Sequence, residues 1–94
     1  DIYAGLQRDL CLIQSFTDAS GRIIFIVTGL TLKGTHVGAL WFVKNVMANP
    51  SAYTDSVYVI GWNDSGASWS AGRVTVTGNG DGFVDYAEIQ KVYP

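Results

Sequence analysis

The stretch LCLIQSFTDASGRIIFIVTGLTL, residues 10–32, decides the fold. Two runs rich in β-branched and aromatic residues, 10–16 and 22–32, flank the turn-forming cluster Thr-Asp-Ala-Ser-Gly at residues 17–21. This order predicts a β-hairpin. Leu6, Leu10 and Ile13 also follow helical spacing, so a helix over the first run stays open as an alternative.

Residues 35–49 carry the strongest helix pattern in the chain. Thr35 supplies a capping hydroxyl at the start, and Asn49-Pro50 marks the end. Apolar residues fill most faces of this helix: Val37, Ala39, Leu40, Trp41, Phe42, Val43, Val46 and Met47. Such a helix needs cover on more than one side, which favours a core position. Insertion at a membrane surface is the less favoured reading, because the helix lacks a basic face.

The rest of the chain supplies further β-structure. Residues 55–62 read as a strand, with Val57 and Val59 on one face and Tyr58, Ile60 and Trp62 on the other. Residues 72–77 alternate in the same way, so the Ser-, Gly- and Asn-rich loop before them predicts a long hairpin, and residues 86–92 read as a short helix. We therefore expect an α+β fold: a two-layer α/β sandwich with an antiparallel or mixed sheet of about four strands, one central apolar helix and a short C-terminal helix. The length fits a single domain over residues 1–94.

Composition narrows the function classes. Charged residues make up 15 % and apolar residues 48 %, which indicates an unusually apolar core or a partner surface. The net charge of −2, with no run of Lys or Arg, argues against a nucleic-acid partner. Cys11 is the only cysteine, so no internal disulfide can form, whereas homo- or hetero-oligomers through Cys11 or through an apolar surface stay open. A chain that begins at Asp1 rather than Met favours a processed, secreted protein.

No residue pattern indicates an enzyme. His36 and Cys11 carry no catalytic signature, and no serine lies in a Gly-x-Ser-x-Gly elbow. We therefore expect no catalytic residues.

Residues 77–88 carry the pattern of a calcium-binding loop. The pattern D-x-[DN]-x-[DN]-G-x5-E places oxygen ligands around a glycine that makes a sharp turn, and Gly82 fixes that register here. The predicted Ca²⁺ ligands are Thr77, Asn79, Asp81, the Phe83 carbonyl, Asp85 and Glu88.

Residues 79–89 resemble the EF-hand family without interruption, including Val84 in the apolar position of the loop and Ile89 after it. The resemblance implies a Ca²⁺ site. Thr77 stands where the family has Asp, so we expect weak affinity, with a dissociation constant of about 0.1–1 mM. A strand-like segment replaces the entering helix, as in the half-motifs of dockerin-like modules. We therefore expect a Ca²⁺ ion that braces the loop rather than a signalling switch.

Two other functions stay open. The layout of residues 23–76 is similar to the α/β-sandwich killer toxins secreted by fungi and yeasts, and this resemblance implies action on membranes or channels of target cells. Alternatively, Trp62 and Trp69 flank a polar loop and could stack on sugar rings, as in a carbohydrate-binding module. The expected partner is accordingly an unknown protein, membrane or glycan.

Overall fold

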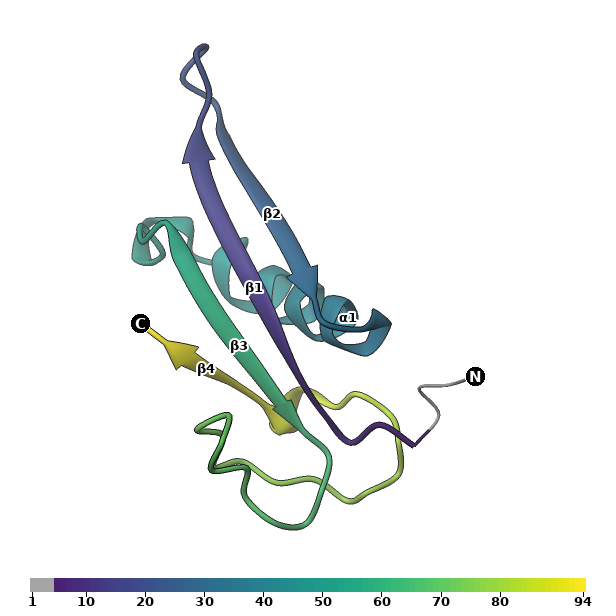
Figure 1. Ribbon diagram of the computed structural model, residues 1–94. Coiled ribbons are helices and arrows are strands. Elements are labelled where there is room, and N and C mark those ends of the chain that lie inside the picture. The colour runs from purple at the N-terminus through teal and green to yellow at the C-terminus, as the bar shows by residue number, and fades with distance from the viewer. Residues whose placement is uncertain (1–4) are drawn as a thin grey trace.

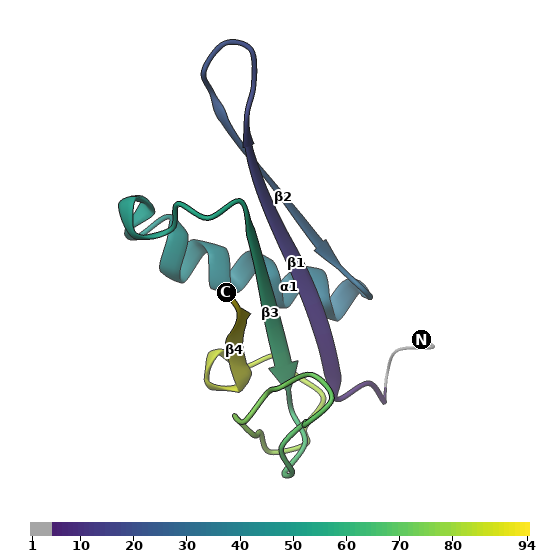
Figure 2. The ribbon, with the colours of Figure 1, turned by 60° about the vertical axis from the view of Figure 1, so that its left-hand side comes forward.

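A four-stranded antiparallel sheet with strand order β2-β1-β3-β4 forms one layer of the computed structural model, which describes residues 5–94 (Figure 1). The strands are β1 (Arg8–Thr17), β2 (Ile23–Gly29), β3 (Val57–Asn63) and β4 (Ile89–Tyr93). Helix α1 (Leu32–Trp41) continues as one π-helical stretch (Phe42–Val46) and crosses one face of the sheet (Figure 2). Two 3-10 turns, Pro50–Ala52 and Tyr86–Glu88, complete the elements. The predicted small α+β architecture with one helix on a sheet is confirmed.

The predicted hairpin is also confirmed, and a helix over the first run is wrong. β1 and β2 pair with Gln14 opposite Ile26. Asp18 closes the turn, because its Oδ1 accepts hydrogen bonds from the N–H groups of Ser20 and Arg22, both at 2.9 Å. Gly21 takes a φ of 81°, a conformation that favours glycine.

The core lies between α1 and the sheet face that it covers. Its buried members are Cys11, Ile13, Val37, Trp41, Val46, Tyr58, Ile60 and Trp62. β3 has the predicted phase, with its even-numbered residues in this core. Cys11 is buried, and this burial raises the pKa of its thiol to about 11.

Helix α1 begins one turn earlier than predicted. Thr31, not Thr35, is its N-cap, and the Thr31 hydroxyl accepts a hydrogen bond from the Lys33 N–H. Asp9 of β1 explains this start, because its buried carboxylate accepts hydrogen bonds from the Thr31 N–H, the Thr31 hydroxyl and the Gly34 N–H. A carboxylate buried at a helix N-terminus is stabilised by those N–H groups. The regular α-helix also ends earlier than predicted, at Trp41.

Two predictions in the last third of the chain are wrong. Residues 72–77 form no strand: Arg73 has a φ of 56°, and only one isolated bridge joins Trp69 to Val74. Residues 86–92 form no helix, because after one 3-10 turn the chain becomes strand β4, in which Ile89 pairs with Trp62. In both segments, contacts distant in sequence outweigh the local pattern.

The outer face of the sheet, opposite α1, is covered at one end only. There Val74 packs over Gly61, as a Cβ on Gly61 would lie 2.3 Å from Val74 Cγ2. Further along, Leu12, Phe16, Ile24 and Ile26 are exposed. Across residues 5–94, no helix combines the length and apolar character that a membrane span requires.

Candidate metal centre

A long loop, residues 64–85, joins the end of β3 to the 3-10 turn before β4. It lies at the end of the sheet where β3 ends, at the bottom of Figure 1. Buried Asn63 anchors it. The Asn63 side-chain amide donates to the carbonyls of Ala67 (2.8 Å) and Val76 (3.0 Å), and its Oδ1 accepts from the Ser65 N–H. Asn63 therefore holds the start of the loop and, through Val76, its middle.

Asp64 is completely buried and binds the glycine-rich turn. Its two carboxylate oxygens accept hydrogen bonds from the N–H groups of Gly80 (3.1 Å) and Gly82 (2.7 Å). Both glycines have positive φ, 73° and 81°, which lets their N–H groups point inward at low steric cost. One carboxylate thus holds residues that are 16 and 18 positions away in the sequence.

Glu88 approaches Asp64 from the opposite side of the loop. It is 2 % exposed, and its Oε1 accepts hydrogen bonds from the Trp62 indole N–H (3.1 Å) and the Asp85 N–H (3.0 Å). A Cβ on Gly78 would lie 2.0 Å from Glu88 Oε2, so only glycine leaves room for this carboxyl group. Two buried carboxyl groups therefore meet, one from each end of the loop.

The two carboxyl groups shift each other's pKa in opposite directions. Burial, and then the hydrogen bond to Asp64, raise the pKa of Glu88. Burial alone would raise the pKa of Asp64 too, but hydrogen bonds from the Glu88 carboxyl and from backbone N–H groups outweigh it and lower that pKa. Glu88 therefore keeps its proton to a higher pH than an ordinary glutamate does, whereas Asp64 loses its proton more readily than an ordinary aspartate.

Asp81 completes a group of three that we call the carboxyl cluster: Asp64, Asp81 and Glu88. One oxygen of each lies within 4.8 Å of the others, so the cluster could hold a metal ion. Asp81 is exposed and gives the cluster its opening to solvent. Carboxylate oxygens at this spacing suit a hard divalent cation, although the arrangement does not identify the metal.

The predicted ligands fall into two groups. Asp81 and Glu88 join the carboxyl cluster. Asn79 instead accepts a hydrogen bond from the Asp81 N–H at 3.3 Å, and the Phe83 N–H donates to Asp81 Oδ1 at 2.9 Å. Thr77 and Asp85 are exposed, the latter as N-cap of the 3-10 turn.

Asp64 was missed because the predicted ligand set was confined to residues 77–88. Asp64 directly follows β3, whose last four residues are all buried. Its place at the end of a buried strand is the feature that marks it as a candidate. An acid that ends a buried strand has to find donors or a cation.

The two tryptophans that could stack on sugar rings lie in different environments. Trp62 is completely buried in the core. Trp69 is half-buried against Gly72, where a Cβ would lie 2.8 Å from its ring.

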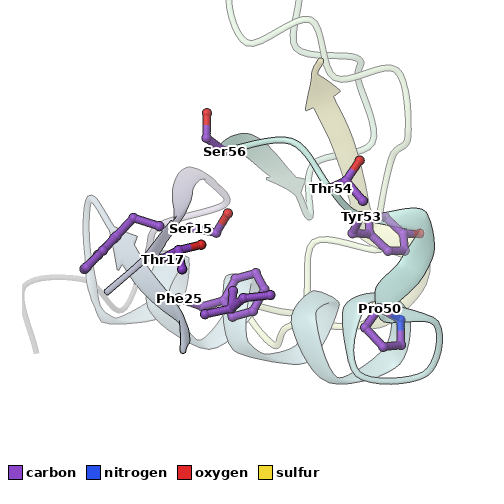
Figure 3. Close-up of a pocket in the computed structure, with 9 residues that line it drawn as sticks. Ser15, Thr17, Phe25, Pro50, Tyr53, Thr54 and Ser56 are labelled. Carbon is purple, nitrogen blue, oxygen red and sulfur yellow. The ribbon is translucent and has the colours of Figure 1, made fainter. Parts of the chain in front are cut away.

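An apolar cavity of about 430 Å³ opens elsewhere, between the far part of the hairpin and residues 50–56 (Figure 3). Its lining includes Phe25, Pro50 and Tyr53 and contains no titratable acid or histidine. This cavity is separate from the carboxyl cluster.

Comparison of the chain with protein-family models, with curated proteins and with solved structures gave no match.

Proposed function

We propose that this chain is a small, secreted, non-enzymatic calcium-binding domain in which Ca²⁺ braces the loop of residues 64–88. The observation that carries the proposal is the convergence of two buried carboxyl groups, Asp64 and Glu88, with the exposed carboxylate of Asp81. Burial of two acids in contact is costly unless a proton or a cation separates their charges. A divalent cation would neutralise the negative charge gathered here and satisfy all three groups.

Calcium is favoured over other metals by ligand type. The cluster offers oxygen atoms only, and neither Cys11 nor His36 belongs to it. Calcium also accepts irregular sets of carboxylate, amide and carbonyl oxygens, whereas magnesium demands near-octahedral geometry. Asn79 and the Phe83 carbonyl are the nearest candidates in sequence to complete such a set.

The expected role is mechanical. The three acids come from the end of β3, the glycine-rich turn and the start of β4, so one ion would cross-link three segments. Such a link stabilises the folded chain by an amount that grows with the logarithm of the ratio of the ion concentration to the dissociation constant.

The first test is thermal unfolding with and without calcium. With a dissociation constant of about 0.1–1 mM, roughly 10 mM Ca²⁺ should stabilise the fold by about 1.4–2.7 kcal/mol. For a domain of this size the melting temperature should rise by about 6–20 °C. The same concentration of Mg²⁺ should raise it much less.

Glu88→Gln is the diagnostic variant. Glutamine keeps the size of the side chain and can donate to Asp64 as the protonated acid does, so the calcium-free fold should persist while the response to calcium disappears. Asp55→Asn is the matched control, because it removes one negative charge from an exposed residue outside the loop. It should respond to calcium as the unmodified chain does.

Terbium luminescence gives a second readout of the same site. The Trp62 indole hydrogen-bonds Glu88, so Tb³⁺ in the carboxyl cluster would be excited through tryptophan. Emission that calcium displaces, and that Glu88→Gln abolishes, supports the proposal. A melting temperature that calcium leaves unchanged, together with no sensitised emission, would refute it.

A further inference from the structure

Among residues 5–94, no strand lies beside the outer edge of β2, which presents a short row of backbone groups. The Leu30 N–H donates to the Leu10 carbonyl, and the Asp18 N–H donates to the Arg22 carbonyl. In this register the even-numbered residues of β2 direct their N–H and C=O groups toward β1. Ile23, Phe25 and Val27 therefore direct theirs outward, while the outward N–H of Gly29 already donates to the Thr35 hydroxyl.

This edge lacks the features that keep sheet edges apart. β2 reads IIFIVTG, with no charge, no proline and no break in its register with β1. The far part of β2 projects beyond α1 (Figures 1 and 2), whereas the Phe25 and Val27 side chains pack against the core on the helix side. Ile23, Ile24 and Ile26 are 67 %, 36 % and 44 % exposed.

The opposite edge of the sheet is protected. β4 has five residues and carries the exposed Lys91, and its pairing with β3 contains a register shift. The Gln90 side chain also accepts hydrogen bonds from the N–H groups of Thr75 and Val76, which brings the loop over this edge. Of the two edges of the sheet, the β2 edge is therefore the one that is open to pairing.

We propose that a second copy of this chain pairs with β2, antiparallel and about a twofold axis at Phe25. Only this centre lets all three outward residues exchange hydrogen bonds, with Ile23 opposite Val27 of the copy and Phe25 opposite Phe25. An axis at Ile26 would instead place Ile23 opposite Gly29, whose N–H is occupied. The outward backbone groups of β2 thus match those of a second β2, so a second copy of the chain is the partner that this edge fits.

The side chains agree with this register. On the outer face, Ile24 of one copy lies opposite Ile26 of the other, twice by symmetry. Such pairs, between residues whose own backbone groups point away, bring side chains especially close. The result is one eight-stranded sheet.

The association should be weak and concentration-dependent. One strand pair buries less than the roughly 800 Å² per partner of a standard stable interface. We expect a dissociation constant on the order of 10 μM, measured by analytical ultracentrifugation. Amide hydrogen exchange should slow at Ile23, Phe25 and Val27 as the concentration rises through that range.

Charge substitutions test the register. Ile24→Glu with Ile26→Glu places like charges opposite each other and should abolish the dimer, as should lysine at both positions. Ile24→Lys with Ile26→Glu places opposite charges together across the axis and should restore dimerisation to within about tenfold of the unmodified chain. Met47→Glu is the control: Met47 is exposed in the turn after the π-helical stretch and is distant in sequence from β2, so this change should leave the dimer unchanged.

Each other result overturns the proposal. If the variant that combines Ile24→Lys with Ile26→Glu stays monomeric while its melting temperature is normal, the register is wrong. If the unmodified chain stays monomeric at all concentrations, no copy pairs at this edge. Binding of that monomer to anionic phospholipid vesicles, lost in the double-glutamate variant, would then assign the surface to a membrane.

Discussion

Replacing Gly38 with alanine tests the closest contact between α1 and the sheet. A Cβ at this position would lie 2.1 Å from the Cys11 sulfur and 2.8 Å from Val27 Cγ1. Overpacking costs about 1–3 kcal/mol, and an overlap this deep belongs to the upper part of that range, about 2–3 kcal/mol. The higher helix propensity of alanine offsets about 1 kcal/mol of that. We expect a net loss of about 1–2 kcal/mol and a melting temperature lower by about 4–15 °C.

A double-mutant cycle identifies the cause. Cys11→Ala removes the sulfur that makes the shorter overlap, so Gly38→Ala should cost at least about 0.5 kcal/mol less in that background. Urea unfolding of the four proteins, followed by circular dichroism, gives the coupling. Gly66→Ala is the control, since a Cβ there has nothing within 4 Å, and it should change stability by less than about 0.5 kcal/mol. Strictly additive costs, or a Gly38→Ala variant as stable as the parent, would refute the packing argument.

Two further predictions concern buried acids. Asp9→Asn should lower the free energy of unfolding by about 2–3 kcal/mol, because an amide presents a donor where the carboxylate accepts hydrogen bonds from Thr31 and Gly34. Chemical unfolding measures this loss, and a loss below about 0.5 kcal/mol would contradict the prediction. Without calcium, the raised pKa of Glu88 contributes stability that is fully present below its ordinary value of 4.5 and is lost as the pH rises through the folded-state value. The lowered pKa of Asp64 acts oppositely, with stability lost as the pH falls below 3.8. Unfolding free energies across this range should therefore decline on both sides, and Glu88→Gln should remove the decline at higher pH.

Local chemistry predicts the hairpin and β3 correctly. The turn at residues 17–21 works as its composition indicates, since Asp18 accepts hydrogen bonds within the turn and Gly21 supplies the positive φ. β3 shows its buried phase through alternation of side-chain size alone. The turn depends on neighbours in sequence. β3 pairs with strands that are distant in sequence, but its alternation is regular enough to indicate which face is buried.

The wrong elements depend on distant partners. Residues 72–77 alternate like a strand, yet the Thr75 and Val76 N–H groups donate to the Gln90 side chain instead of a neighbouring strand. Ile89 and Val92 have helical spacing, but the edge of β3 offers unpaired backbone groups that Ile89–Tyr93 takes up. The helix start moved for the same reason, since the Asp9 carboxylate comes from β1.

The residues of the carboxyl cluster also differ in whether local sequence predicts them. Asp81 and Glu88 follow from the loop pattern, because their spacing is set by a short stretch of chain. Asp64 joins them only after the loop has folded back, so no local spacing could indicate it.

The buried thiol of Cys11 has an experimental consequence of its own. Because the sulfur lies against Gly38 and stays protonated at neutral pH, a thiol reagent can modify it only when helix and sheet separate. With a single cysteine in the chain, the modification rate reports that one opening event without any engineered probe. Calcium-bound and calcium-free protein can then be compared under fully native conditions. The comparison shows whether an ion in the carboxyl cluster holds the helix onto the sheet or stabilises only the loop beneath it.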